Sequence, residues 1–270
     1  MLDPKPGQDF IDATVGAGGH AEAILERIAP HGRLIGIERD PGMLTIARRG
    51  LTRFGPRFVP VCALYDRINE IAADEKMGPF HGVLFDLGIS SWHLEHSGRG
   101  FSFQRDELLD MRFNPEEGGP TAADILNGSS QDELARILQE YGEEPYAYGI
   151  AKAIAQKRKQ KRLETTFQLV EIIARAAKKR TARIHPATKT FQALRIAVNH
   201  EYDVLERGLG VAKEVLAPGG KIAAIAFQGL EGRIIKNVLR PYHIRAPSYE
   251  EIRQNPRARS AHLYFFQNNV

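Results

Sequence analysis

A glycine-rich loop near the start of the chain is the first segment that could bind a ligand. Residues 15–20 read Val-Gly-Ala-Gly-Gly-His, between an apolar β-like run at 10–13 and a helical stretch at 21–29. Glycines let a backbone approach a ligand closely, and the N-terminus of a following helix favours negative charge. Glu38, about 20 residues further on, ends a second apolar run, where a carboxylate can accept hydrogen bonds from both hydroxyls of a ribose. The pair indicates a nucleoside-containing cofactor, either NAD or S-adenosylmethionine.

The spacing of the glycines favours S-adenosylmethionine. A dinucleotide fingerprint reads Gly-x-Gly-x-x-Gly, whereas here Ala21 takes the last place and Gly18 and Gly19 are adjacent. Two alternatives stay open. One is an NAD-dependent oxidoreductase acting on a small metabolite. The other is a structural role, in which the glycines permit a tight turn and Glu38 caps a helix.

Asp86 is a second candidate, because it ends the apolar run that begins at residue 82. Ligands of open α/β sheets bind at the carboxyl ends of the strands. The Asp86 carboxylate could accept a hydrogen bond from an exocyclic amine of the cofactor or the substrate, or it could simply cap Ser90 or Ser91. His20 and His185 could act as general bases, although a single His more often has a structural role.

A loop at 99–106 and a basic segment at 150–200 suggest a polyanionic partner. The loop alternates Arg99, Phe101, Phe103 and Arg105. Exposed aromatic rings between basic residues can stack an unpaired base, and burial of these rings beneath an inserted domain is an equal alternative. The basic segment holds 13 Lys and Arg residues and two acids, although the net charge of the chain is only +4. Its densest cluster is Lys157, Arg158, Lys159, Lys161 and Arg162, with a second at 178–180. We expect these groups to contact phosphates, and a solvated helix face is the alternative.

The order of the expected elements predicts an α/β fold with an insertion. Strands expected at 10–13, 33–38, 58–61 and 82–87 alternate with helices, and Asp40-Pro41 begins one helix as its N-cap and first residue. This alternation predicts a doubly wound parallel sheet. Helices follow near 131–140, 144–158, 166–179 and 188–207, with possible capping boxes at Thr121/Asp124 and Ser130/Glu133. A turn at 218–220, a strand at 222–227, a helix near 230–240 and a strand at 262–266 then resume the α/β pattern.

Composition excludes several classes of protein. The single cysteine, Cys62, allows no internal disulfide and removes the usual structural zinc sites, and we expect no metal. The chain has neither a basic and apolar leader nor an apolar stretch of membrane-spanning length. A cytoplasmic protein without a membrane partner is therefore expected.

Many segments together resemble the RsmH/MraW family, the small-subunit ribosomal RNA cytosine-N4-methyltransferases. They are Gly-Ala-Gly-Gly-His at 16–20, Glu-Arg-Asp-Pro at 38–41, Asp-Leu-Gly-Ile-Ser-Ser at 86–91, Arg-Gly-Phe-Ser-Phe at 99–103, Leu-Asp-Met-Arg at 109–112, Thr-Ala-Ala-Asp-Ile-Leu-Asn at 121–127, Tyr-Gly-Glu-Glu at 141–144, His-Pro-Ala-Thr-Lys-Thr-Phe-Gln-Ala-Leu-Arg-Ile-Ala-Val-Asn at 185–199, Leu-Ala-Pro-Gly-Gly at 216–220 and Asn-Pro-Arg-Ala-Arg-Ser-Ala at 255–261. The stretches at 99–112 and 185–199 are far more specific than a glycine loop.

The resemblance implies a Rossmann-like, S-adenosylmethionine-dependent methyltransferase sheet with an inserted all-helical domain. We place the core at 1–114 and 186–270 and the substrate-recognition domain at 115–185. The cofactor would be S-adenosyl-L-methionine, and the substrate 16S ribosomal RNA in the small subunit. Implied cofactor contacts are Gly18, Gly19, His20, Glu38, Tyr65, Asp86 and His93, of which Glu38, Tyr65 and His93 replace the family's Asp, Phe and Gln. Asp86 would also orient the target amine. Arg105, Arg112, Arg195 and the 157–162 cluster would hold the RNA backbone. The sequence leaves a monomer and a homodimer both open.

Two departures from the family motivate an alternative function. Residues 226–233 read Ala-Phe-Gln-Gly-Leu-Glu-Gly-Arg, where the family usually has Ser-Phe-His-Ser-Leu-Glu-Asp-Arg. The family's stretch ahead of the first strand, with its His-x-Pro-Val-Leu-like segment, has no counterpart here, so we expect a truncated sequence or a trimmed lineage. The alternative is a divergent relative that binds cofactor and RNA but methylates a different target or none.

Overall fold

A computed structural model describes residues 1–176 and 185–269, so the basic cluster at 178–180 lies outside the described residues. The chain forms two compact units: unit 1 is Met1–Gly88 with Tyr202–Val270, and unit 2 is Ile89–Glu201. Unit 2 is thus inserted in unit 1, and its bounds are wider than 115–185. Residues from the flanking stretches, such as Phe101, Leu109 and Phe191, are buried in the core of unit 2, which explains the wider bounds.

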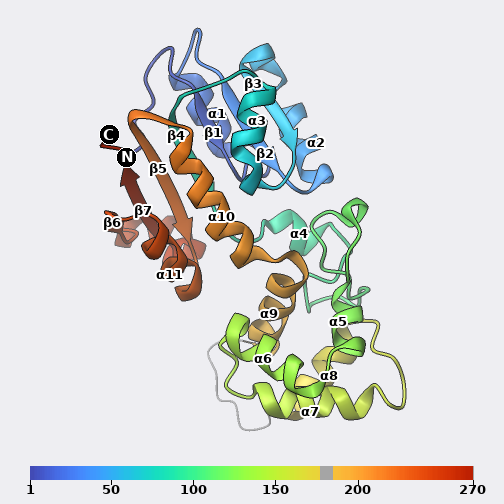
Figure 1. Ribbon diagram of the computed structural model, residues 1–270. Coiled ribbons are helices and arrows are strands. Elements are labelled where there is room, and N and C mark those ends of the chain that lie inside the picture. Colours follow the sequence, from blue (N-terminus) through green and yellow to red (C-terminus); the bar gives the residue numbers. More distant parts are fainter. Residues whose placement is uncertain (177–184, 270) are drawn as a thin grey trace. The chain divides into compact units, whose positions relative to one another are not determined.

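The sheet of unit 1 has the strand order β3-β2-β1-β4-β5-β7-β6 (Figure 1). The strands are β1 (Phe10–Asp12), β2 (Leu34–Glu38), β3 (Phe58–Cys62), β4 (Phe80–Asp86), β5 (Leu216–Ala226), β6 (His243–Arg245) and β7 (His262–Gln267). Each pair formed among β1 to β5 is parallel, whereas β7 runs antiparallel to both β5 and β6. The expected α/β fold is confirmed, and the expectation of a wholly parallel sheet is wrong at β7.

Helices cover both faces of this sheet. Successive strand residues point to opposite faces. Phe10 of β1 therefore packs in one apolar cluster with α1 (Gly19–Arg27) and α2 (Pro41–Gly50). Its neighbour Ile11 packs in another cluster with α3 (Ile68–Asp74) and α10 (Glu201–Glu214). Both faces of β1 are thus buried where the glycine loop begins to leave the sheet. The remaining helices of this unit are α11 (Gly229–Val238) and α12 (Tyr249–Gln254).

Unit 2 is helical in its described part. Its helices are α4 (Ser91–Glu95), α5 (Ala122–Gly128), α6 (Gln131–Gly142), α7 (Ala147–Lys157), α8 (Thr166–Ala176) and α9 (Thr188–Asn199). The capping box at Thr121 and Asp124 is confirmed, and Ser130 caps α6 by accepting the Glu133 amide. A single helix over 188–207 is wrong, because His200 has a left-handed backbone (φ 52°) that ends α9 before α10 begins.

The turn expected at 218–220 lies inside β5 rather than before it. The pairing of β4 with β5 shifts register between Phe80–Leu216 and Gly82–Lys221, and Gly219 takes the positive φ (75°) that this irregularity needs. In the described residues, no helix combines the length and the apolar character that crossing a membrane requires.

Candidate functional site

The carboxyl ends of β1, β2 and β4 bring three acidic residues to one edge of the sheet. Asp12 ends β1, Glu38 ends β2 and Asp86 ends β4. The chain connects β1 to β2 on one side, while β4 lies on the other side of β1. Such a reversal of strand order is where ligands of open α/β sheets bind. Three acidic residues therefore end neighbouring strands at the edge of the sheet where the sequence predicts a ligand site.

The glycine loop after β1 has the conformation that its glycines permit. Gly16 (φ 53°) and Gly18 (φ 96°) lie in the left-handed region, which favours glycine. Gly18 is the N-cap of α1 and, as a glycine, provides no side-chain cap for the amides of the first turn. Apart from its chain neighbours and the backbone of its own helix, no atom of the described residues would lie within 4 Å of a Cβ on Gly19. The loop is therefore open at Gly19.

Glu38 ties the end of β2 to the glycine loop. Its carboxylate accepts hydrogen bonds from the amides of Gly16 (3.1 Å) and Asp40 (2.9 Å). Burial raises the pKa of Glu38 to about 7, although both of these amides lower it. Asp40, not Glu38, caps α2, accepting the amides of Gly42 and Met43. The structure therefore places Glu38 beside the loop and assigns the helix cap to Asp40.

His20 and Asp86 contact each other over the same edge. The His20 Nε2 atom lies 3.4 Å from Asp86 Oδ2. The Asp86 hydrogen bond raises the pKa of His20, and the nearby Asp12 charge adds to this effect. The backbone amide of Asp86 donates to the Thr14 hydroxyl at 2.7 Å, which fixes the end of β4 against the start of the loop. The sequence left open that Asp86 caps Ser90 or Ser91. In the structure, the side chain of Ser90 acts as the N-cap of α4 by accepting the His93 amide.

Tyr65, the expected aromatic wall, is held from two sides. Its ring packs edge-on against Phe85 of β4, with centroids 5.4 Å apart. On α10, Gly208 makes room for it, since a Cβ there would lie 2.5 Å from Tyr65 Cδ2. Next in the chain, Asp66 accepts two hydrogen bonds from the Arg207 guanidinium, at 2.8 and 3.0 Å. Tyr65 is therefore positioned by β4 and by α10.

His93, the seventh expected cofactor contact, belongs to unit 2. It is 5% exposed, and its Nδ1 atom lies 2.8 Å from Ser90 Oγ. Its ring packs edge-on against Phe101 and Phe113. Phe101 itself is 6% exposed, in agreement with the core alternative for this ring. Phe103 is half-buried, and it stacks on His185 with centroids 4.4 Å apart.

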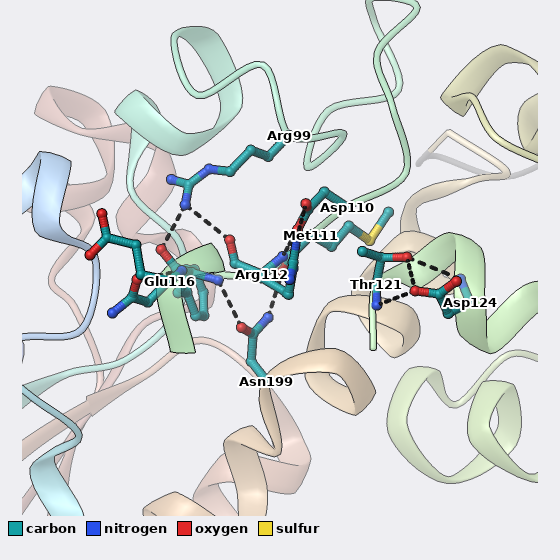
Figure 2. Close-up of polar contacts among 10 residues, drawn as sticks. Arg99, Asp110, Met111, Arg112, Glu116, Thr121, Asp124 and Asn199 are labelled. Atoms are coloured by element: carbon teal, nitrogen blue, oxygen red, sulfur yellow. Dashed lines mark hydrogen bonds and ion pairs between the residues drawn. The ribbon is translucent and has the colours of Figure 1, made fainter. Parts of the chain in front are cut away.

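A polar network in unit 2 fixes the loop that contains Met111 (Figure 2). Met111 has a positive φ (60°) and is fully buried. The Asn199 amide donates to Met111 O (2.7 Å), and its oxygen accepts the Phe113 amide (2.9 Å). The Arg99 guanidinium donates to the backbone oxygens of Arg112 and Phe113, at 3.0 and 2.6 Å. Arg99, expected to contact RNA, thus serves to hold this loop.

Among the other expected RNA contacts in the described part of the chain, the arginine side chains form polar contacts within unit 2, whereas the lysine side chains of the 157–162 cluster do not. The arginines each bind another part of unit 2: Arg105 donates to Glu95 O, Arg112 pairs with Asp110, Arg158 donates to Leu126 O, Arg162 pairs with Asp124 and Arg195 pairs with Glu201. Arg195 is also 8% exposed. Lys157, Lys159 and Lys161 are exposed, and their side chains have no hydrogen bond or ion pair with the described part of the chain. The lysines are therefore the members of the cluster best placed to meet a phosphate.

The divergent segment at 226–233 forms a regular helix start. Gln228 is the N-cap of α11 in a capping box with Glu231, and the Tyr202 hydroxyl donates to Gln228 Oε1 at 3.1 Å. A Cβ on Gly232 would collide with the hydroxyl of Tyr264, a residue of β7. The neighbouring strand thus favours glycine where the family has Asp.

Sequence reasoning missed two residues of this site, Asp12 and Gly208. Asp12 lies three residues before the glycine loop and is fully buried, and its place near the end of the first expected strand was the available signal. Gly208 lies within a helix and has no local signal, because the need for glycine comes from Tyr65, far away in the sequence.

Comparison with known proteins gives a consistent result along the chain. The family model described as MraW methylase family matches residues 1–246. The Ribosomal RNA small subunit methyltransferase H of Thermomicrobium roseum is 43% identical, in an alignment that covers 97% of this chain and 88% of that protein. The proteins of the same name from Beutenbergia cavernae and Geobacter sulfurreducens are 48% and 47% identical, covering 86% and 89% of this chain and 70% and 78% of those proteins. The resemblance seen in the sequence motifs is confirmed: this chain belongs to the MraW methylase family.

Proposed function

We propose that this protein transfers a methyl group from S-adenosylmethionine to the exocyclic N4 atom of a cytosine in 16S ribosomal RNA of the small subunit. The observation that carries the proposal is the 43% identity, over 97% of the chain, to a protein named Ribosomal RNA small subunit methyltransferase H. The site geometry agrees with it, because a glycine loop and three strand-end acids meet at the reversal of the strand order.

The residues present suit a cationic nucleoside cofactor. Two buried carboxylate oxygens, Asp12 Oδ2 and Asp86 Oδ1, have no hydrogen-bond partner among the residues that the structure describes, and such oxygens favour a ligand with positively charged N–H donors. Pyrophosphate, the centre of NAD, would instead bring negative charge to this acidic edge. The cofactor residues of the proposal are Gly18, Gly19, His20, Glu38, Tyr65, Asp86 and His93.

The chemistry asks the protein for positioning more than for acid or base catalysis. S-adenosylmethionine supplies a sulfonium methyl group that is already strongly electrophilic. The amine of cytosine is a weak nucleophile, because its lone pair is delocalised into the ring. Asp86 would accept a hydrogen bond from this amine and orient it so that the nitrogen lone pair points towards the methyl group. S-adenosylhomocysteine would leave, and the proton lost from the methylated amine would pass to solvent. The target base must be unstacked or single-stranded to be reached.

The RNA backbone would be held by the exposed lysines of unit 2, Lys157, Lys159 and Lys161. Phe103 is the stacking candidate that remains partly accessible, and the arginines shape the surface that carries these groups. The site of action would be the bacterial cytoplasm, where ribosomal subunits are found, with a monomer and a homodimer both compatible with the proposal.

The test is methyl incorporation from labelled S-adenosylmethionine into small ribosomal subunits that lack cytosine-N4 methylation. We expect label on cytosine N4, identified by mass spectrometry of the digested nucleosides. Asp86→Asn should reduce the rate at least tenfold, while Asp74→Asn, an exposed acid on α3, should leave it unchanged.

Two other outcomes would overturn the proposal. Absence of label, with S-adenosylhomocysteine binding intact, would favour the divergent relative that methylates a different target or none. Tight binding of NADH without binding of S-adenosylhomocysteine would favour the oxidoreductase.

A further inference from the structure

A stretch of unit 1 at 240–262 is rich in arginine. It holds five arginines and two acids, Glu250 and Glu251, and Glu251 belongs to the capping box of α12 with Ser248. Outside this stretch and the basic segment at 150–200, the chain is acidic, with 19 basic and 29 acidic residues. A basic region on an acidic protein is typical of a surface that binds a polyanion.

Two exposed side chains of α12 lie on one face of the helix. Tyr249 and Arg253 are four residues apart, a spacing that makes them neighbours on a helix surface. Tyr249 is 81% exposed, more than any other large apolar side chain in the described part of the chain. Arg253 is also exposed, and its guanidinium has no hydrogen bond or ion pair with the described residues. An aromatic ring beside a cation can stack an unpaired base while the cation binds a phosphate of the same strand.

Two further exposed arginines lie in the segments next to α12. Hydrogen bonds from Ser248 lower the pKa of Glu251, and the charge of Arg245, at the end of β6, adds to this effect, so Arg245 lies near α12. Arg259 lies in the 3-10 helix Pro256–Ser260, which packs against α12, and its side chain has no hydrogen bond or ion pair within the described part of the chain.

Protection of the sheet explains only one of these charges. β6 is the outermost strand, beyond β7 (Figure 1), and a charged residue on such a strand prevents pairing with another chain. That role would account for Arg245. Arg253 and Arg259 lie outside any strand, so their exposure needs another reason.

The sheet places this stretch at the same edge as the candidate site. β5 and β6 both run antiparallel to β7, so their carboxyl ends share one edge. Asp86 of β4 pairs with Ile225 of β5, and Ile225 pairs with Leu263 of β7. Leu263 pairs in turn with Arg245, the last residue of β6. Three strand spacings of about 4.8 Å, or roughly 14 Å, therefore separate Arg245 from Asp86 across the sheet.

We propose that unit 1 carries an RNA-binding surface of its own, which holds the strand next to the target cytosine. This α12 surface consists of Arg245, Tyr249, Arg253 and Arg259. The tyrosine stacks an unpaired base, and the guanidinium groups bind phosphates. The inference rests on the proposed function, which identifies the polyanion as RNA. An acidic protein segment would pair with the arginines alone, so the exposed tyrosine is the residue that favours RNA.

The first experiment measures RNA binding by the full chain. Fluorescence anisotropy follows a labelled single-stranded oligocytidine of about twelve nucleotides, a length within the site sizes of single-strand-binding folds, at several salt concentrations. We expect Arg253→Gln/Arg259→Gln to weaken binding about tenfold and to make the slope of log K against log salt shallower by about 1.4, because two phosphate contacts are lost. An affinity equal to that of the wild type would overturn the α12 surface and leave its arginines to an acidic protein segment.

The matched control replaces two arginines of unit 1 that lie away from this edge. Arg27 and Arg49 are in the last turns of α1 and α2. These helices follow β1 and β2, so they begin at the edge of the candidate site and run away from it. Both arginines are exposed, and their side chains have no hydrogen bond or ion pair with the described residues. Arg27→Gln/Arg49→Gln removes the same charge and should change RNA affinity much less, because salt screens charges far from the bound strand.

Tyr249 tests the stacking of a base. Tyr249→Ala should weaken binding of the oligocytidine roughly fivefold or more without changing the salt slope, because stacking releases no counterions. Tyr249→Phe keeps the ring and should bind as the wild type does. Urea denaturation and S-adenosylhomocysteine binding should match the wild type for every variant, since the replaced side chains are exposed. An unchanged affinity of Tyr249→Ala would overturn the stacking role.

The second experiment tests whether the α12 surface binds the substrate strand. In steady-state methylation of small ribosomal subunits, Arg253→Gln/Arg259→Gln should raise KM several-fold and leave kcat nearly unchanged, because the surface contacts RNA away from the reacting atoms. An unchanged KM would overturn the place of the surface next to the target cytosine. A wild-type chain that binds the oligocytidine through this surface and puts no label on cytosine N4 would instead contradict the proposed function, so the two failures remain distinguishable.

Discussion

At the scale of single residues, Asp12 illustrates a conflict between folding and binding. A carboxyl group that is buried without a compensating positive charge disfavours its own ionised form. Asp12 is fully buried, and the half-exposed His20 that lowers its pKa does not offset the effect of burial. An uncharged residue at this position would be expected to give a more stable chain.

This conflict predicts the pH dependence of stability. The pKa values of Asp12 and Glu38 are raised to about 7 in the folded chain, so between about pH 4 and pH 7 the folded state binds protons that the unfolded state has released. The free energy of unfolding should therefore fall as pH rises through this window and level off above it. The raised pKa of His20 acts in the same direction, since its contribution is lost as pH rises above about 6.5.

Asp12→Asn should remove most of the contribution from this residue. Urea denaturation of the ligand-free chain should show the variant roughly 2–4 kcal/mol more stable than wild type at pH 7.5 and nearly equal to it at pH 4.5. Asp74→Asn should track the wild type at both pH values. A stability difference that does not depend on pH would contradict the assignment.

At the scale of elements, α10 sets the position of Tyr65 through a single missing side chain. A Cβ on Gly208 would lie 2.5 and 2.8 Å from the Tyr65 Cδ2 and Cε2 atoms. A Cβ on Gly210, two residues later, would have no atom of the described residues within 4 Å, its own helix backbone and chain neighbours aside. Glycine in a helix interior costs about 1 kcal/mol relative to Ala. At Gly208 the packing of Tyr65 offsets this loss of helix stability. At Gly210 the missing side chain makes room for no neighbour among the described residues.

The two glycines therefore provide a matched pair of substitutions. Gly208→Ala should lower the free energy of unfolding by about 1–3 kcal/mol, because the helix or the tyrosine ring must shift, and it should weaken S-adenosylhomocysteine several-fold by moving Tyr65. Gly210→Ala should raise stability by roughly 0.5–1 kcal/mol through helix propensity and leave binding unchanged. Denaturation and calorimetry on both variants check this, and similar behaviour of the two would rule out the contact with Tyr65 as the cause.

The elements that could be predicted from the sequence are those with local causes. The Asp40-Pro41 helix start, the Thr121 capping box and the alternation of strands and helices each depend on neighbouring residues. The end of α9 could not be predicted, because the left-handed conformation of His200 interrupts a pattern that stays helical on both sides. The antiparallel direction of β7 and the burial of Asp12 depend on partners distant in the sequence. The same holds for Arg158 and Arg162, whose partners Leu126 and Asp124 are 32 and 38 residues away in the sequence.

At the scale of the whole molecule, the basic residues of the 157–162 cluster are of two kinds. Some form contacts within unit 2, and others are exposed and can bind a phosphate. Arg158 donates to Leu126 O at 2.7 Å, and Arg162 pairs with Asp124 at 2.7 Å. Reversing these charges would break contacts within unit 2, so a change in RNA binding could not be separated from a change in folding. Lys157, Lys159 and Lys161 are exposed, and their substitution leaves those contacts in place.

Replacing Lys157, Lys159 and Lys161 together by Glu should therefore weaken RNA binding without loss of folding. Binding of each phosphate releases counterions, so the slope of log K against log salt should become shallower by about 0.7 for each phosphate of a single strand that the variant no longer binds. The control replaces Lys5, Lys76 and Lys236 of unit 1 by Glu, which makes the same change in net charge at positions outside the basic segment. Fluorescence anisotropy with a small-subunit RNA fragment at several salt concentrations measures both proteins. If Lys157, Lys159 and Lys161 bind phosphates, only their replacement changes the slope. An equal effect of the two triple variants would assign the basic cluster to general charge attraction.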